Sequence, residues 1–467
     1  MKAIISNSLK QIIPAGIVIM FALGCERDIA NLEPASYSDM PEVFIDGFSQ
    51  GLNYAAFGGS LPTAFDVDED VTYNNSKASM KFEVPDYNDP RGGYAGGVFF
   101  TSEGRDLSAY NALTFYARSS QPATIDLVGF GNDLGESNSQ VSLSALKVTT
   151  NWNKFIIPIP DPSKLKSERG MLFYSEGPED ERGYTFWIDE VKFEKLGTIA
   201  YPQPAILLGQ DQVISTFEGV STSIGGISST FNLPNGVNTQ VNLAASYFEF
   251  SSSNEAIATV DVSGKVTVTG GPGTAVITAK MGLTDADGSL TIQSGGTFQH
   301  APVPTHSQAD VISLFSDSYT NVPVDYYNGY WAPYQTTQSA DFEVNGDNIL
   351  HYTNFNFVGV QFSSPTINAS SMTHLKVNIF IPNALAGGTQ FKIQLVNFGA
   401  DGVYGGGNDS SHTLTFTAPT LVAQSWITFD IPLSSFTGLT ARANLGQLIF
   451  EGSNISSFYA DNIYFHK

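Results

Sequence analysis

Short runs in which hydrophobic and polar residues alternate recur along the chain. Examples are "ALTFYAR" (112–118), "KFIIPIP" (154–160), "FKIQLVNF" (391–398) and "WITFDIP" (426–432), and Gly, Pro, Asn or Asp bound such runs. A period of two residues is typical of strands with one buried face. No window shows the longer period and the end caps of an amphipathic helix. The pattern therefore predicts an all-β fold.

Two long segments, residues 40–196 and 305–467, carry matching motifs in the same order. Such repetition indicates two copies of one domain, and several short strands in each copy predict a β-sandwich of the jelly-roll type. The matches are "FIDGF" with "LFSDSY", "GVFF" (97–100) with "GVQF" (359–362), "DLSAYNALTFYAR" with "NASSMTHLKVNIF", "DLVGFGND" (126–133) with "QLVNFGAD" (394–401), "NWNKFIIPI" with "SWITFDIPL", and "FWIDEVKF" with "FYADNIYF".

A different unit lies between the copies, at residues 203–296. Its central part, "FEFSSSNEAIATVDVSGKVTVTGGPGTAVITAK" (248–280), resembles the bacterial Ig-like domain of the second family. The resemblance implies a small β-sandwich that serves as a spacer or adhesive module. Two proline-containing segments, 197–205 and 297–307, are predicted to be semi-rigid joints on either side of it.

The N-terminus has the features of a secretory signal. Lys2 and Lys10 precede and flank the start of an apolar run, "IIPAGIVIMFALG", which ends before Cys25, the single cysteine of the chain. This run is too short to span a bilayer. "FALGC" resembles a bacterial lipobox, which implies a signal peptide at 1–24, lipidation of Cys25 and a lipid-anchored linker at 25–39. An ordinary signal peptide with an incidental cysteine is the alternative.

The charge of the chain limits its ligands. The formal net charge is −23, and removal of residues 1–24, with their two lysines, makes it −25. Nucleic-acid affinity comes largely from Lys and Arg that neutralise phosphates, so a nucleic acid is excluded as a partner. Polyanionic glycans match this charge poorly as well, whereas neutral ligands and divalent cations match it.

The two repeated segments resemble jelly-roll carbohydrate-binding modules. The shared signature is an early "F.DGF" or "FSD.Y", a late "W..F.IPI" and a closing "ID.V.F". The whole layout resembles surface glycan-binding lipoproteins of the Bacteroidetes. That resemblance implies an outer-membrane protein, lipid-anchored and facing the exterior, which presents a neutral polysaccharide to a glycan importer and its associated binding lipoprotein. "VISLFSDSYTNVPVDYYNGYW" (311–331) also resembles modules of laminarin-degrading enzymes, which suggests a β-1,3-glucan.

The segment "YYNGYWAPY" (326–334) concentrates five aromatic residues in a stretch that is predicted to be a loop. Aromatic faces are flat apolar partners for the C–H patches of sugar rings, and exposed aromatic clusters usually mark contact surfaces. The expected glycan-binding residues here are Trp331, Tyr327, Tyr330 and Tyr334. The alternative is that the loop folds back and fills one end of the sandwich.

The first copy offers a second set of candidates. Arg91 and Tyr94 lie in the glycine-rich "NDPRGGYAGG" (88–97), and Tyr54 lies in "LNYAAFGG" (52–59). A plain glycine-rich hairpin is the alternative for the first of these segments. Trp152 and Trp426 begin equivalent strands and are expected in the cores, and Trp187 is expected to be structural unless it lines a concave face.

Calcium is the expected ion. Jelly-roll modules similar to these often hold a structural Ca²⁺ between an acid of the first strand and one of the last. The resemblance places such pairs at Asp46 with Asp189, and at Asp317 with Asp461. Calcium takes six to eight oxygen ligands, so backbone carbonyls would supply several. Solvated turn carboxylates are the alternative.

Signs of catalysis are missing from the sequence. It contains no Glu-x-Asp-x-x-Glu strand motif, no HExxH pattern, no G-x-S-x-G elbow and no phosphate loop, and its six histidines are scattered. The expected function is therefore non-catalytic binding. A structural or adhesive surface protein is the alternative, followed by a glycoside hydrolase with a dyad assembled from distant strands.

Overall fold

The computed structural model describes residues 37–467, and residues 340 and 341 by their backbone only. The predicted signal peptide and Cys25 lie outside this range. Strands and turns make up nearly all of it, which confirms the all-β prediction. Within it, no helix is both long and apolar enough to cross a membrane. The only helices in this range are short 3₁₀ turns: η2 (Pro162–Lys164), η3 (Leu207–Gly209), η4 (Ala245–Tyr247), η5 (Gln308–Asp310) and η6 (Leu433–Ser435).

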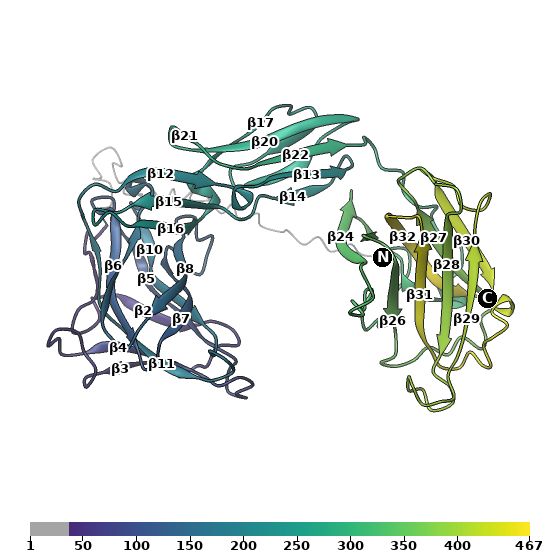
Figure 1. Cartoon of the computed structure of the whole chain (residues 1–467), viewed down its shortest axis with the longest axis horizontal. Coiled ribbons are helices and arrows are strands. Elements are labelled where there is room, and N and C mark those ends of the chain that lie inside the picture. Colours follow the sequence, from purple (N-terminus) through teal and green to yellow (C-terminus); the bar gives the residue numbers. More distant parts are fainter. Residues whose placement is uncertain (1–36) are drawn as a thin grey trace, which may run out of the picture.

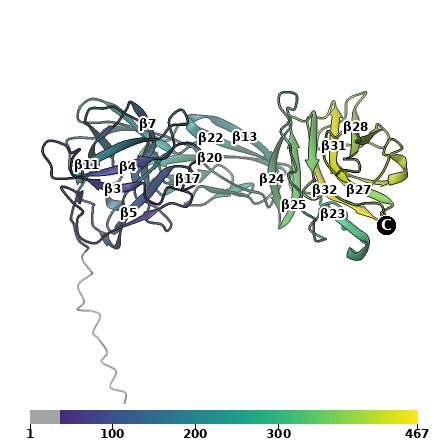
Figure 2. The same ribbon diagram turned by 90° about the horizontal axis from the view of Figure 1, so that it is seen from below.

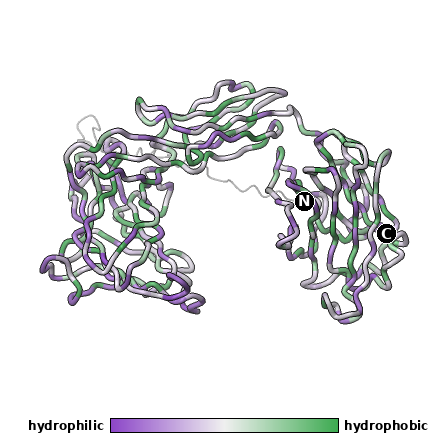
Figure 3. Tube along the Cα trace, viewed as in Figure 1, coloured by the Kyte–Doolittle hydropathy of each residue, from purple (hydrophilic) through white to green (hydrophobic). Residues whose placement is uncertain are grey.

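The described chain forms an arch of three units (Figure 1). Two sandwiches lie on the same side of a middle unit. Figure 2 shows the three units in a row. Hydrophobic and hydrophilic residues alternate along the strands of both sandwiches (Figure 3), as expected for sheets with one buried face.

The first sandwich has two antiparallel sheets. One contains, in spatial order, β3 (Phe65–Asp68), β4 (Ser79–Val84), β11 (Tyr184–Glu194), β6 (Ala112–Ser119) and β9 (Asn153–Pro158), with β1 (Glu42–Phe44) paired to β11. The other contains β8 (Val141–Val148), β7 (Ala123–Phe130), β10 (Glu168–Glu176), β5 (Ala95–Arg105) and β2 (Leu52–Ala56).

The distal sandwich has the same strand order. One sheet contains β24 (Gln338–Val344), β25 (Asp347–Thr353), β32 (Ser457–His466), β27 (His374–Phe380) and β30 (Trp426–Pro432), with β23 (Val311–Phe315) paired to β32. The other contains β26 (Phe357–Gln361), β31 (Leu445–Ser453), β28 (Gln390–Asn397) and β29 (Ser410–Phe416). Strand β2 alone has no counterpart in this sheet.

The middle unit is joined to the first sandwich by a continuous sheet. Strands β12 (Ala200–Ala205), β15 (Ser228–Asn232) and β16 (Asn238–Leu243) extend the second sheet, because β16 pairs with the edge of β8 at Ser142 and Val141. The predicted joint at 197–205 is therefore wrong over most of its length: it forms β12, which pairs with β15. One hydrophobic core cluster runs through both units.

The remaining strands of the middle unit form two small sheets. They are β13 (Asp211–Thr216), β22 (Ser289–Ser294), β20 (Gly273–Met281), β17 (Glu249–Ser252) and β21 (Thr284–Asp285) in one, and β14 (Ser221–Ser223), β19 (Lys265–Val268) and β18 (Ala258–Val260) in the other. The distal sandwich has its own core. A small aromatic cluster around Phe298, Phe342 and Tyr459 joins it to the middle unit.

Candidate functional site

The aromatic segment 326–334 lies along the edge of β26, where the first sandwich has β2. The backbone of Tyr326 bridges to Gln361, with the Gln361 N–H donating to the Tyr326 carbonyl at 3.0 Å. The segment therefore continues the sheet at its edge without forming a regular strand.

Trp331 is held against the outer face of this sheet. The six-membered end of its ring lies directly over Gly359 of β26, where a Cβ atom would collide with the ring. Its Nε1–H donates to the Tyr326 hydroxyl at 3.3 Å, and that hydroxyl donates to Gln361 Oε1 at 2.7 Å. The side chain is half-buried, so Gly359 provides a notch in which the indole rests while part of it stays open to solvent.

Polar side chains lie in rows on the same outer face. Val358, Val360, Leu448 and Phe450 point into the distal core, so the residues between them point outward. Register places Gly359 beside Ile449, Gln394 and Thr413. The neighbouring row contains Phe357, Glu451, Lys392 and Thr415, and the opposite row contains Gln361, Gln447, Val396 and Ser411.

The polar groups on this face are paired, and most of them are partly exposed, although Gln447 is buried. Lys392 Nζ and Glu451 Oε1 form an ion pair at 2.5 Å, in which both side chains are partly exposed. The Gln447 amide donates to Gln361 Oε1 at 3.0 Å, and the Gln394 amide to the Ser411 hydroxyl at 3.3 Å. A half-open indole beside amides, hydroxyls and a neutralised charge pair can stack on a sugar ring and hydrogen-bond to its hydroxyls.

The tyrosines of the segment have different environments. Tyr330 and Tyr334 are 58% and 79% exposed. Tyr330 has a positive φ of 48°, and its N–H donates to Asn328 Oδ1 at 3.0 Å, which supports this uncommon conformation. Tyr327 points inward, so its expected role in binding is wrong: its hydroxyl donates to the Leu314 carbonyl at 2.8 Å, its ring packs on the distal core, and burial raises its pKa.

A further exposed ring lies on the loop that follows β28, and sequence reasoning missed it. Phe398 lies over Gly446 of β31, outside the core cluster, and the ring of Tyr404 stands 5.4 Å from it with 66% exposure. This loop, "GADGVYGGGND" (399–409), is not among the predicted binding segments. The signal that could have identified it is a lone tyrosine among glycines, which is hard to bury.

The first sandwich has a similar notch on its corresponding strand. A Cβ at Gly96 of β5 would collide with the ring of Tyr94 and touch Phe57. The Tyr94 hydroxyl donates to the Gly58 carbonyl at 3.0 Å, and both rings are half-buried. Each sandwich thus seats an aromatic ring over a glycine on the same side of the equivalent sheet.

The other two candidates of the first sandwich are placed differently. Tyr54 is wrong as a binding residue, because it packs on Phe65 and Phe99 of the core, shares a 2.8 Å hydrogen bond with the Tyr174 hydroxyl, and has its pKa raised by burial. Arg91 is exposed, but both its Nε and its Nη2 donate to Asp89, at 3.1 and 2.7 Å. Its donor fork is therefore occupied.

The tryptophans outside the aromatic segment do not share one role. Trp152 is half-buried outside the core and lies 6.0 Å from Tyr73, so its predicted core position is wrong. Trp426 is not in the core either: it packs on Phe298, and its Nε1–H donates to the Gln299 carbonyl, where the middle unit meets the distal sandwich. Trp187 donates to Asp68 at 2.9 Å, with Arg118 over its ring.

The expected calcium pairs lie near loops of their own sandwiches. Asp189 is buried, which raises its pKa, and it accepts from Tyr73 N, the Ser76 hydroxyl and Glu190 N. Asp46 accepts from Lys77 N. These two carboxylates therefore hold the loop 73–77 through hydrogen bonds.

The distal pair lies in a more open acidic cavity. Asp317 and Asp461 line a cavity of about 220 Å³ together with Asp347 and His300. Burial, and then the charges of Asp347 and Asp317, raise the pKa of Asp461 to about 7. Hydrogen bonds occupy these carboxylates too, because Asp317 accepts from Asn348 and Asp461 accepts from Asn462.

Glu176 is a second buried carboxylate with the raised pKa that a catalytic acid would need. Burial raises the pKa of Glu176 to about 7, and the charges of Asp126 and Glu179 act in the same direction. Its oxygens accept from the Tyr184 hydroxyl at 2.8 Å and from Asp126 N at 2.6 Å, and it is almost fully buried. Glu176 therefore stabilises the fold through these hydrogen bonds and is not exposed to a ligand.

Family models match the first sandwich and the middle unit. Residues 45–195 match the family model of carbohydrate binding domain 30. That match spans the first sandwich, which is therefore similar to a carbohydrate-binding module. Residues 244–287 match the immunoglobulin-like domain of intimin, which supports an Ig-like middle unit through a different family from the one expected. A comparison with curated proteins finds no match.

Several solved structures are similar to parts of the chain. A family 30 module of a Clostridium thermocellum cellulosomal cellulase has 20% identity, covers 35% of this chain and 96% of its own, and has a TM-score of 0.23. A tandem of family 22 modules from Paenibacillus barcinonensis has 12% identity, coverage of 93% and 100%, and a TM-score of 0.22. A β-1,2-glucanase from Parabacteroides distasonis has 10% identity, coverage of 57% and 40%, and a TM-score of 0.25.

Proposed function

We propose that this protein binds a neutral polysaccharide without cleaving it, chiefly on the outer face of the β26–β31–β28–β29 sheet. The observation that carries the proposal is Trp331, half-open in the Gly359 notch beside rows of amide, hydroxyl and charged groups. The family match of the first sandwich supports carbohydrate as the ligand class.

The chemistry of the face favours an uncharged glycan. Lys392 and Glu451 neutralise each other, and the partly exposed amides of Gln361 and Gln394 offer both donors and acceptors for hydroxyl groups. The net charge of −23 opposes a polyanion. Stacking on Trp331 would supply most of the affinity and the amides most of the orientation.

The finer parts of the proposal depend on resemblance. We take a β-1,3-glucan such as laminarin as the first ligand to test, because of the likeness of residues 311–331 to laminarin-related modules. Lipidation of Cys25 would anchor the protein in the outer membrane, facing outward, beside an importer that receives the glycan. Calcium is proposed for the acidic cavity of Asp317, Asp347 and Asp461.

Affinity electrophoresis against a panel of glycans tests the proposal. Retardation by laminarin and not by charged polymers is expected, and Trp331→Ala should abolish most of it while Trp331→Phe retains part. Tyr201→Ala is the matched control, because Tyr201 is 80% exposed but lies in β12. Unchanged retardation of the Trp331→Ala variant would remove this face from the proposal.

The match to the intimin Ig-like domain favours an adhesive protein as the second candidate. In that case the sandwiches would bind proteins, and no glycan of the panel would retard the chain. Incubation with the same glycans followed by measurement of new reducing ends tests for a hydrolase, and none are expected to form.

A further inference from the structure

Three side chains that are distant in the sequence meet at one end of the other distal sheet. His374 begins β27, Asp430 is near the end of β30, and His466 ends β32, and β27 lies between the other two strands. Register places His374 opposite His466. The neighbouring Leu375, Ile431 and Phe465 belong to the distal core, so the three side chains share the outer face.

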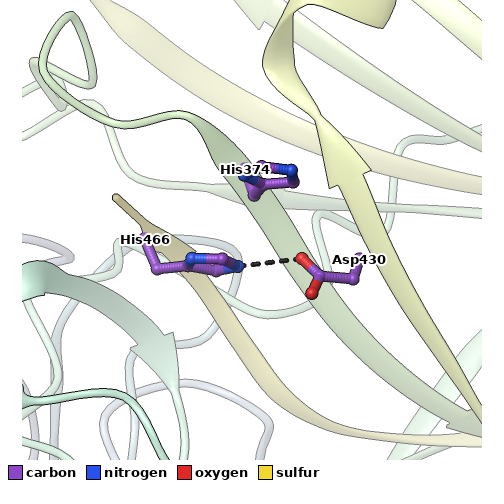
Figure 4. Close-up of side chains that lie close together, drawn as sticks. All are labelled: His374, Asp430 and His466. Carbon is purple, nitrogen blue, oxygen red and sulfur yellow. Dashed lines mark hydrogen bonds and ion pairs between the residues drawn. The ribbon is translucent and has the colours of Figure 1, made fainter.

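We propose that His374, Asp430 and His466 bind a divalent transition-metal ion, with Zn²⁺ as the best match. One ligand atom from each of the three residues lies within 4.8 Å of the others. Figure 4 shows the two imidazole rings one above the other, with His466 joined to Asp430. The rings are 5.0 Å apart and 7° from parallel, and His466 Nε2 is 2.8 Å from Asp430 Oδ1.

Partners outside the cluster contact Nδ1 on both rings. Thr373 Oγ1 lies 2.8 Å from His374 Nδ1, and the Lys467 carbonyl lies 2.9 Å from His466 Nδ1. Metal-binding histidines usually donate their second N–H to such a group, which fixes the tautomer and the ring orientation. Both Nε2 atoms therefore remain as ligands.

The contacts of His466 point in the same direction. Its Nδ1 faces a carbonyl and its Nε2 faces a carboxylate, and both are acceptors. A neutral imidazole has one N–H and satisfies only one of them. A positive charge at Nε2 satisfies the whole arrangement: either a second ring proton that donates to Asp430, or a metal ion shared by Nε2 and Asp430, with Nδ1–H donating to the Lys467 carbonyl in both cases.

The ligand set selects the metal. Two imidazoles and one carboxylate suit Zn²⁺, which takes such donors in a four-coordinate site and would keep one position for water. Calcium and magnesium prefer oxygen ligands. The positive charge of Lys376 disfavours a cation here, because Lys376 lies beside Asp430 in register. Its Nζ is directed to the Tyr464 ring, at 5.9 Å from the ring centre. His306, stacked 3.9 Å from His466, covers the other side of that ring.

Zinc titration of the full chain tests the site. The protein is stripped with a chelator, and Zn²⁺ is added in competition with a chromogenic indicator. The His374→Gln and Asp430→Asn variants should each bind one zinc ion fewer per chain, or bind it with an affinity lower by about tenfold or more. His412→Gln, a histidine on β29, is the matched control and should bind as the unaltered chain does. Lys376→Gln should bind zinc more tightly.

Two results would overturn the proposal. One is the absence of zinc binding by the unaltered chain, and the other is equal stoichiometry and affinity in the His374→Gln and Asp430→Asn variants. Co²⁺ in place of Zn²⁺ provides a second readout, since its visible absorption in the unaltered chain should be absent from both variants. Circular dichroism of each variant separates lost binding from lost folding.

Discussion

At the scale of single residues, the glycine notch is the feature on which the proposed function depends. Gly359 and Gly96 matter because they lack a side chain: each leaves room for a ring to lie against its strand. At Gly359 the backbone has no positive φ, so alanine is compatible with the strand itself. The notch can therefore be filled without a direct backbone penalty.

We predict that Gly359→Ala displaces the indole of Trp331 and weakens glycan binding, because the new Cβ occupies the place of the ring. Retardation by laminarin and tryptophan fluorescence measure the two effects. In the Trp331→Ala background the same substitution should have no further effect on binding. An additional loss of glycan binding in that double variant would contradict the claim that Gly359 acts only by seating Trp331.

Glu176 gives the first sandwich a dependence on pH. Its pKa is about 7 in the fold and about 4.5 in an unfolded chain, so between these values the folded state holds a proton that the unfolded state has lost. Its contribution to stability is thus greatest at low pH and is lost as the pH rises from about 4.5 to 7. Glu176→Gln should flatten this part of the curve of unfolding free energy against pH.

The reason for choosing glutamine is geometric. Its carbonyl can accept from Asp126 N while its amide donates to the Tyr184 hydroxyl, so both partners of Glu176 remain satisfied. Denaturant unfolding measures the free energy of unfolding at each pH. If this free energy falls as steeply from pH 5 to pH 7 in the variant as in the unaltered chain, Glu176 is not the group responsible.

At the scale of elements, the alternation pattern identified strands better than it identified their faces. "FKIQLVNF" and "WITFDIP" were predicted as strands and form β28 and β30. Yet the two matching valines are on different faces of their sheets. Phe99 of "GVFF" is in the core, so its neighbour Val98 is on the outer face, whereas Val360 of the matching "GVQF" is in the core. A shift of one residue reverses the face, and local sequence contains little information about that shift.

Long-range contacts explain the other differences. Segment 197–205 has the prolines of a linker, but β15 offers it an edge, so it becomes β12. Trp152 and Trp426 are equivalent in sequence, but Phe298 reaches only the second. The His374–Asp430–His466 cluster was invisible for the same reason, because three strands must be in register before those side chains meet.

The sheet that joins β8 to β16 should make two units unfold together. Tyr247 lies in the core cluster that they share, and its hydroxyl donates to the Ser139 carbonyl at 3.1 Å. We predict one calorimetric transition for the first sandwich with the middle unit and a separate one for the distal sandwich. Tyr247→Ala should lower the free energy of unfolding in the first transition by about 3 kcal/mol and leave the second transition unchanged. Tyr247→Phe should have a small effect on either transition.

At the scale of the whole molecule, two ring-bearing faces on one chain suit a polymeric ligand. The two sandwiches lie on the same side of the middle unit (Figure 1). When one face has bound a long glycan, the other meets the same chain at a raised effective concentration. On the proposed function, duplication would therefore increase the affinity for long glycans without a new contact.

We predict that affinity for a long β-glucan exceeds affinity for a short oligosaccharide by about 10² or more. Filling the first notch by Gly96→Val should remove most of that excess and leave oligosaccharide binding at the distal face unchanged. Isothermal titration with ligands of graded length measures both. Equal losses for long and short ligands would indicate a single binding face.

The junction between β8 and β16 also determines which fragments of this chain will stay soluble. Residues 40–196 alone would bare the N–H and C=O groups of Val141 and Ser142 that β16 otherwise satisfies. Such an open edge is a template for pairing with another copy. A piece ending near residue 196 should therefore self-associate at high concentration, and one ending near residue 296 should remain monomeric.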